Sequence, residues 1–239
     1  MISVKPLASS SKGNCYYISD GSSSLLLDAG ISIKAIRQGI GFSLSLVAGV
    51  LITHSHGDHC KAVKELIKAG VSVYMSEPTK TAQGVSGHRV EVIKERQQFN
   101  VGTWTILPFE AQHDCEGALG FLLANRTGEK LLYLTDSYYC KYTFTGLSHI
   151  LIECNHSYEI LDRNVANGSL PAAQKKRLIQ SHMSLENAKK FLQANDLSKV
   201  QEIWLIHLSD GNSDADLFKR AVQGLTGKPV YIAAERELA

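Results

Sequence analysis

The sequence predicts an α/β fold in which two mixed β-sheets pack together and helices cover their outer faces. Short apolar runs rich in β-branched and aromatic residues alternate with segments of helical periodicity. The first half has more strands than helices, with hairpin-like connections at 19–24 and 125–130. A chain of 239 residues with 44% hydrophobic side chains is expected to form one domain over 1–239.

The individual elements follow from these patterns. The expected strands are 15–19, 24–28, 47–53, 71–75, 103–109, 119–125, 130–136, 149–154, 202–208 and 229–234. The expected helices are 32–39, 60–70, 184–195 and 213–225. Ser184 and Ser213 lie where helix N-caps belong, and Gly70 follows the second helix as a stop signal. Residues 155–181 are expected to form a long irregular segment of the kind that usually carries function.

Composition sets limits on the function. Lys and Arg number 25 against 23 Asp and Glu, and this net charge of +2 does not by itself predict a polyanionic partner. The five cysteines have irregular spacings and no CxxC pair, which argues against a disulfide framework and a zinc ribbon. No export signal follows Met1, and no apolar run approaches the roughly 18 residues that span a bilayer. We therefore expect a cytoplasmic protein with no membrane partner.

A cluster of potential metal ligands follows the apolar strand 47–53. His54 and His56 are two positions apart, so their side chains point the same way in an extended segment. A glycine then allows a bend, after which Asp58 and His59 reach a second point in space. This arrangement predicts two divalent cations with nitrogen and oxygen ligands, and the alternative is a solvated polar loop.

Three further candidate ligands lie at or just beyond the ends of later strands: His113, Asp136 and His207. A carboxylate such as Asp136 can bridge two ions through its two oxygens. Each residue is ambiguous alone, because a single histidine is more often structural. Together they are the remaining ligands that a two-metal site requires.

This order of residues resembles the metallo-β-lactamase fold over nearly the whole chain. The resemblance implies a four-layer αβ/βα sandwich and assigns the two metals to His54, His56 and His113, and to Asp58, His59 and His207, with Asp136 between them. The stretch "LLLDAG" resembles the first motif of that fold, whose Asp, here Asp28, braces the metal loop by hydrogen bonding. The alternative for Asp28 is an ordinary turn residue at a strand end.

Four further stretches resemble the WalJ/YycJ-type subfamily, whose members are similar to 5′→3′ DNA exonucleases: "LASSSKGNCYYI", "LIECNHS", "QSHMSLENAKKFL" and "IHLSDGN". The order of the last two also parallels the ribonuclease Z family. By that parallel, His182 is not a ligand but lies near the leaving-group oxygen as a proton donor or transition-state stabiliser. Alternatively, His182 caps the helix that begins near Ser184.

Substrate contacts are predicted from charge and from the resemblance. Residues 163–190 contain six basic side chains and one acid, Glu186, which is an excess of +5. Lys175, Lys176 and Arg177 are expected to contact phosphates, or else to form a solvated helix face. The resemblance places Asn155 and His156 near the metals and the substrate, although turn hydrogen bonding explains them nearly as well. Three tyrosines offer stacking faces for bases or else pack at the rim: Tyr138, Tyr139 and Tyr142.

The resulting functional expectation is a metal-dependent phosphodiesterase or nuclease, similar to a DNA 5′→3′ exonuclease. A hydroxide activated by two metal ions, Zn²⁺ or Mn²⁺, attacks phosphorus with help from Asp58, and His182 assists the leaving oxygen. One alternative is a phosphodiesterase of the same fold that acts on cyclic nucleotides or other small cyclic phosphates. Another is a catalytically idle partner-binding protein, which would be expected to have lost ligands, yet all seven positions are filled.

Overall fold

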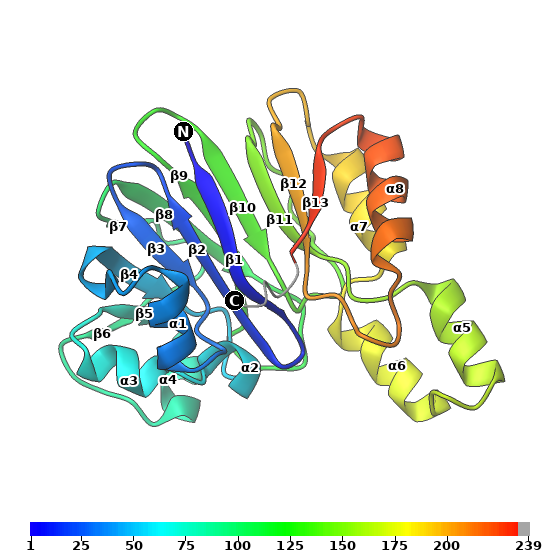
Figure 1. Cartoon of the computed structure of the whole chain (residues 1–239), viewed down its shortest axis with the longest axis horizontal. Helices are drawn as coiled ribbons and strands as arrows, with labels where there is room; N and C mark the ends of the chain where they lie inside the picture. Colours follow the sequence, from blue (N-terminus) through cyan, green and yellow to red (C-terminus); the bar gives the residue numbers. More distant parts are fainter. Residues whose placement is uncertain (234–239) are drawn as a thin grey trace. The chain divides into compact units, whose positions relative to one another are not determined.

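The computed structural model of the chain describes residues 1–233 and confirms the predicted α/β fold, with two mixed β-sheets flanked by helices (Figure 1). The chain divides into two compact units, of which the first comprises residues 1–110 and 115–129 and the second 111–114 and 130–233. No helix within residues 1–233 is long and apolar enough to cross a membrane.

The first unit contains a six-stranded sheet in the order β1-β2-β3-β4-β5-β6. Its strands are β1 (Ser3–Ser10), β2 (Gly13–Ser19), β3 (Ser24–Leu27), β4 (Val47–Leu51), β5 (Val73–Met75) and β6 (Val90–Val92). The first three pair antiparallel, and the pairs from β3 to β6 are parallel. An antiparallel meander follows, formed by β7 (Phe99–Val101), β8 (Trp104–Glu110) and β9 (Leu119–Ala124).

Short helices cover one face of this six-stranded sheet. They are α1 (Ile33–Gly39), α2 (Gly57–Cys60), α3 (Val63–Lys68) and α4 (Glu77–Gln83), and a 3₁₀ turn lies at Leu44–Leu46. Ile36 of α1 and Leu66 of α3 are fully buried in one cluster with Leu26, Val50 and Val73 of the sheet. Apolar side chains at alternate strand positions thus fix which face the helices cover.

The second unit contains four parallel strands in the order β13-β12-β11-β10. They are β10 (Lys130–Leu134), β11 (His149–Glu153), β12 (Glu202–Ile206) and β13 (Val230–Ile232). The inner strands are almost uninterrupted apolar runs, as expected of parallel strands buried on both faces. The helices are α5 (Tyr158–Ala166), α6 (Ala172–Ser181), α7 (Leu185–Ala194) and α8 (Ala215–Thr226), and α7 and α8 lie side by side (Figure 1).

The prediction of a long irregular segment at 155–181 was wrong, because α5 and α6 fill most of it. Ser157 caps α5 by accepting a hydrogen bond from the N–H of Ile160, and Pro171 stands at the start of α6. Helix α6 buries only Ser181, so it lacks the apolar stripe by which a helix is recognised in a sequence.

Smaller differences concern helix boundaries. The predicted helix 60–70 corresponds to α3, which the short helix α2 precedes, and four further elements were not predicted: β1, α4, β6 and β7. Ser184 caps α7 as predicted, since its hydroxyl accepts from the N–H of Asn187. The cap of α8 is Asp214 rather than Ser213, whose hydroxyl donates instead to the carbonyl of Ser209 at 2.6 Å.

Candidate metal centre

The loop after β4 brings two imidazoles together in the first unit. The Nε2 atom of His54 lies 3.1 Å from the Nδ1 atom of His56. The other ring nitrogen of His54 lies 2.9 Å from the hydroxyl of Thr53. Two nitrogens that are each about 2.0–2.1 Å from one tetrahedral ion are separated by about 3.3 Å. The His54–His56 pair therefore has the donor type and the spacing that one divalent ion requires.

The second pair in this loop lies on the short helix α2. His59 is fully buried, and its Nδ1 lies 2.8 Å from a carboxylate oxygen of Asp28. Its Nε2 lies 3.4 Å from Asp58 Oδ2 and 3.2 Å from the side-chain amide nitrogen of Asn14. A hydrogen bond from Nδ1–H to Asp28 places the ring's lone pair on Nε2, which faces Asp58. His59 and Asp58 thus offer a nitrogen and an oxygen to one point.

Asp28 links the end of β3 to this loop. Its buried carboxylate accepts hydrogen bonds from the backbone N–H of Thr53 at 2.8 Å, from the Thr53 hydroxyl at 3.0 Å and from His59. The backbone of Asp28 is left-handed, with φ of 59°, a conformation that aspartate tolerates better than most residues. This geometry supports the bracing role that the sequence predicts, and it gives no support to a simple turn residue.

Gly30, two residues further on, packs backbone to backbone against the same loop. Its N–H donates to the carbonyl of Asn14 at 2.8 Å, and the N–H of Ala29 donates to the carbonyl of His59 at 2.8 Å. A Cβ atom on Gly30 would stand 1.6 Å from the carbonyl oxygen of Asp58. The "DAG" sequence therefore ends in glycine because only a residue without a side chain fits there.

In the second unit, strand register brings the remaining candidates to one edge. Leu134 of β10 pairs with Ile152 of β11, and Glu153 pairs with Ile206 of β12. The carboxyl ends of these parallel strands therefore meet, and residues at or just beyond these ends are neighbours: Asp136, Glu153 and His207.

Asp136 lies between two imidazoles of this unit. Its Oδ2 is 3.7 Å from His113 Nε2, and its Oδ1 is 3.0 Å from His207 Nδ1. Asp136 and His207 both have left-handed backbone, with φ of 46° and 52°. The other ring nitrogen of His113 lies 2.9 Å from the carbonyl of Ser181. Each oxygen of Asp136 thus faces a different histidine.

Glu153 belongs to the candidate site, although the sequence reasoning missed it. It is fully buried at the end of β11, where its Oε1 lies 2.7 Å from His182 Nδ1 and 2.8 Å from His207 Nδ1. Its Oε2 accepts from the backbone N–H groups of Ser137 at 3.1 Å and Met183 at 2.9 Å. An acid that closes an otherwise apolar strand was the available signal, because carboxylates are rarely buried without partners.

The charges of this cluster determine its protonation. Burial raises the pKa of the Glu153 carboxyl, but the charge of His182 and hydrogen bonds from His182 and His207 outweigh it and lower that pKa to about 2. Burial lowers the pKa of His182, whereas the charge and hydrogen bond of Glu153 raise it above its ordinary value. Glu153 is therefore ionised and favours a proton on Nδ1 of His182. Ser184, not His182, caps the next helix.

Asn155 and His156 lie inside the fold rather than on a substrate-facing surface. Asn155 is 4% exposed, and its amide donates to the carbonyl of His207 at 2.9 Å. His156 is fully buried, and burial lowers its pKa to about 4. Buried side chains do not present atoms to a substrate, so we assign Asn155 to holding the His207 backbone. The predicted substrate contacts of these two residues have no support in this geometry.

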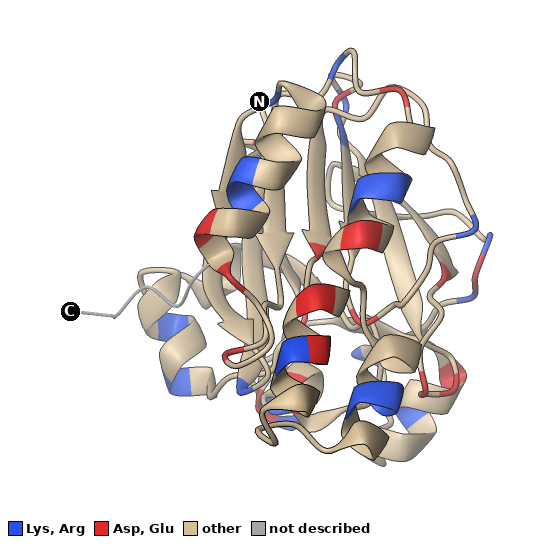
Figure 2. Ribbon diagram, turned by 90° about the vertical axis from the view of Figure 1, so that its right-hand side faces the viewer, with Lys and Arg blue, Asp and Glu red and all other residues tan. Residues whose placement is uncertain are grey.

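The predicted phosphate-binding residues lie on α6. Lys175 is paired with Asp162, and Arg177 lies 3.5 Å from a carboxylate oxygen of Asp114. Lys176 is exposed. Basic and acidic segments are interleaved over the helices (Figure 2). Neighbouring acids therefore offset part of the +5 excess that the sequence shows.

Comparison with known proteins identifies the family of this chain. Residues 24–208 match the model of the beta-lactamase superfamily domain. The chain is 29% identical to Exodeoxyribonuclease YycJ of Bacillus anthracis over 234 residues, which cover 90% of this chain and 86% of that protein. It is also 29% identical to Exodeoxyribonuclease WalJ of Streptococcus pneumoniae serotype 2 over 228 residues, 88% and 83% of the two chains. Among solved structures, the metallo-beta-lactamase fold protein YhfI from Bacillus subtilis has a TM-score of 0.75 at 16% identity, and the match covers 98% of this chain and 97% of that chain.

Proposed function

Since the chain belongs to the beta-lactamase superfamily, we propose that it is a metal-dependent hydrolase of phosphodiester bonds in nucleic acid, acting on DNA as a 5′→3′ exonuclease. The relatives named exodeoxyribonucleases support the substrate, since they align over more than four fifths of both chains. The observation that carries the proposal is a cluster whose potential ligand atoms all lie within 4.8 Å of one another: Asp136, Glu153, His182 and His207. This cluster combines metal-ligand chemistry with a histidine suited to proton transfer.

In this proposal seven residues hold two divalent ions: His54, His56, Asp58, His59, His113, Asp136 and His207. Five imidazoles and two carboxylates form a donor set that suits Zn²⁺ and Mn²⁺ alike. When bound, such ions acidify a water molecule and neutralise charge on the phosphate oxygens. Asp28 holds His59 in the tautomer that offers Nε2, and Asn155 holds the backbone of His207.

Two side chains also act on protons in this proposal. The Asp58 side chain is 24% exposed, so it can accept a hydrogen bond from a water molecule and orient that water toward phosphorus. His182 is 19% exposed, and Glu153 binds its Nδ1. Its Nε2 is therefore the atom that would deliver a proton to the departing oxygen. Leaving-group protonation is the step that an alkoxide requires, and a positioned histidine typically contributes 10²–10⁴-fold.

The proposal is tested with end-labelled single- and double-stranded DNA and RNA, incubated with the purified protein in Mn²⁺ or Zn²⁺. We expect stepwise release of nucleotides from the 5′ end of DNA and loss of this activity with a chelator. Asp58→Ala should abolish cleavage, whereas Asp216→Ala, which removes an exposed acid in the first turn of α8, should not.

Two outcomes would overturn the proposal in favour of the alternatives. Hydrolysis of a chromogenic phosphodiester with every nucleic acid left intact would identify a small-molecule phosphodiesterase. A purified protein that retains no divalent metal and cleaves nothing would identify a partner-binding scaffold.

A further inference from the structure

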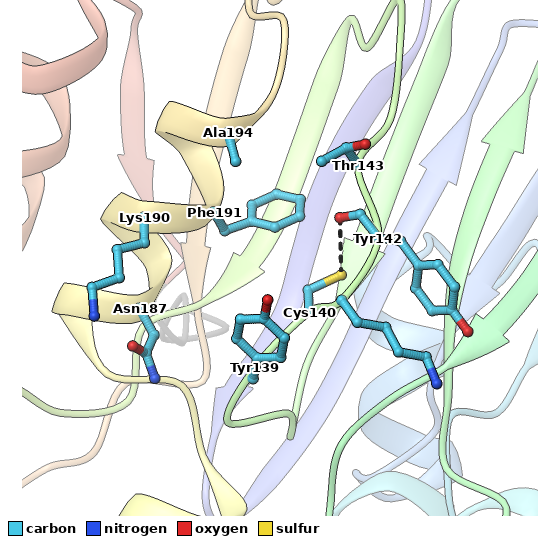
Figure 3. Close-up of a pocket in the computed structure, with 9 residues that line it drawn as sticks. Tyr139, Cys140, Tyr142, Thr143, Asn187, Lys190, Phe191 and Ala194 are labelled. Atoms are coloured by element: carbon cyan, nitrogen blue, oxygen red, sulfur yellow. Dashed lines mark hydrogen bonds between the residues drawn. The ribbon is translucent and has the colours of Figure 1, made fainter.

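A cleft of about 270 Å³ lies within the second unit, between the segment that follows Asp136 and helix α7 (Figure 3). Tyr139, Cys140 and Tyr142 line it from the segment, and Asn187, Lys190 and Phe191 line it from the helix. The lining includes two lysines and no acid. Its volume is just below the range of pockets for drug-sized ligands, so it suits one small planar group.

The aromatic side chains of this cleft differ in exposure. Phe191 is 6% exposed and packs against Phe144, with ring centroids 6.3 Å apart. Tyr139 is 54% exposed, although its carbonyl is held by the Ser137 hydroxyl at 2.8 Å. Its phenolic hydroxyl makes no hydrogen bond within residues 1–233. A ring that is fixed at its backbone yet open to solvent is a stacking surface rather than part of the core.

Positive charge borders the aromatic surface. The Lys141 ammonium lies 5.4 Å from the centre of the Tyr142 ring. Lys190 forms no ion pair with another residue of the described chain, and in Figure 3 its side chain extends from α7 past Asn187, away from the Tyr139 ring. An aromatic face bordered by positive charge is the combination that binds single-stranded nucleic acid, through base stacking and phosphate contact.

Both walls of the cleft continue directly from the proposed catalytic residues. Tyr139 is three residues after Asp136, which limits their separation to roughly 10 Å. The Asn187 amide donates to the Tyr138 carbonyl at 2.9 Å and so ties the two walls together. Helix α7 begins at Leu185, three residues after His182. Both walls of the cleft therefore begin within a few residues of the proposed site of phosphodiester cleavage.

We propose that this cleft binds a single unstacked base of the substrate strand, with the base on Tyr139 and an adjoining phosphate at Lys190. The inference rests on the proposed nuclease function and specifies how the strand is held. Because a base inside a duplex cannot reach such a surface without leaving the stack, the strand must be single or frayed at this position.

The test uses metal-loaded protein and single-stranded DNA with phosphorothioate linkages that resist hydrolysis, so that binding is measured without turnover. One abasic position is moved along the strand from its 5′ end, and affinity is read from fluorescence anisotropy. In the wild type we expect one position at which loss of the base weakens binding at least about 5-fold, since stacking contributes ~1–3 kcal/mol per base.

Three variants identify the residues responsible. Tyr139→Ala should weaken binding of the intact strand by a similar factor and abolish the penalty at that position, whereas Tyr139→Phe should keep both. Tyr231→Ala removes another exposed tyrosine, on β13, and should leave the pattern unchanged. Lys190→Gln should reduce the slope of log K against log[salt] by about 0.7, which corresponds to one phosphate contact on a single strand.

The outcomes separate this inference from the proposed function. If no position is sensitive, if the strand does not bind, or if the penalty survives in Tyr139→Ala, the cleft is not a base site. Hydrolysis of ordinary DNA by the same preparation would then leave the nuclease proposal standing. Conversely, the protein could show a position-specific penalty that depends on Tyr139 and yet not hydrolyse ordinary strands. That result supports base binding in the cleft and overturns the nuclease proposal.

Discussion

Replacing Asp28 with asparagine is the sharpest test of how the metal loop is held. Asparagine keeps the size of the side chain but has one oxygen and one NH₂ group in place of two accepting oxygens. If its oxygen continues to accept from Thr53, as Asp28 Oδ1 does at 2.8 Å, the amide nitrogen faces His59 Nδ1. His59 must then turn its Nδ1 lone pair to that amide and carry its proton on Nε2. The proton thus occupies the atom proposed to bind metal.

The size of the effect follows from this tautomer change. Loss of a hydrogen-bond partner behind a metal ligand typically costs 10–100-fold in metal affinity. For Asp28→Asn we therefore expect the dissociation constant of the ion proposed to bind His59 to rise by about that factor, or ~1.4–2.8 kcal/mol. The proposed nuclease activity should fall in parallel at limiting metal and recover in part when metal is added.

The measurement is a titration of metal-free protein with Zn²⁺ or Mn²⁺ against a chromophoric chelator. Asp20→Asn is the matched control, because the Asp20 carboxylate in the same unit also accepts hydrogen bonds from the Ser22 and Ser23 N–H groups and the Thr103 hydroxyl. That variant should lose stability without losing metal affinity. Equal affinities in wild type and Asp28→Asn would refute the assignment of Asp28 as the residue that sets the His59 tautomer.

Three further substitutions test other contacts. Gly30→Ala would place a Cβ 1.6 Å from the Asp58 carbonyl oxygen, so we expect the melting temperature to fall by at least about 5 °C. Gly57→Ala is the control, because open space surrounds the added Cβ, and it should leave the melting temperature nearly unchanged. Glu153→Gln should lower kcat roughly 10–100-fold at unchanged KM, since His182 loses its charged partner. Glu202→Gln serves as the control. An unchanged kcat in Glu153→Gln would contradict the role of Glu153 in positioning His182. Ser184→Ala removes the cap of α7 and should cost ~1 kcal/mol in thermal unfolding, more than Ser213→Ala, which caps nothing.

The first unit's part of the site was predictable because its signals are local in the sequence. Four potential ligands follow one buried strand within six positions, and the Asp28 turn follows the neighbouring parallel strand. Parallel neighbours end at the same edge of a sheet, so polar residues just after apolar runs were expected to meet there.

Other features depend on contacts that the sequence does not reveal. The buried carboxylate of Glu153 is stabilised by hydrogen-bond donors from residues 137, 182, 183 and 207. No single stretch of the sequence shows that these residues converge. Helix α6 lacks an apolar face, so periodicity did not distinguish it from a loop. The burial of His156 depends on how α5 and α7 pack around the end of β11, and composition carries no information about it.

The left-handed backbone at Asp28, Asp136 and His207 has a consequence for engineering. Such a conformation costs an ordinary L-residue roughly 1–2 kcal/mol, and glycine relieves it. A library screened only for heat resistance would therefore enrich glycine at Asp136 and His207 wherever this relief exceeds the loss of the native side chain's hydrogen bonds. Such survivors would melt later but lack a proposed metal ligand, so selection of a more stable version of this protein has to monitor metal binding in every round.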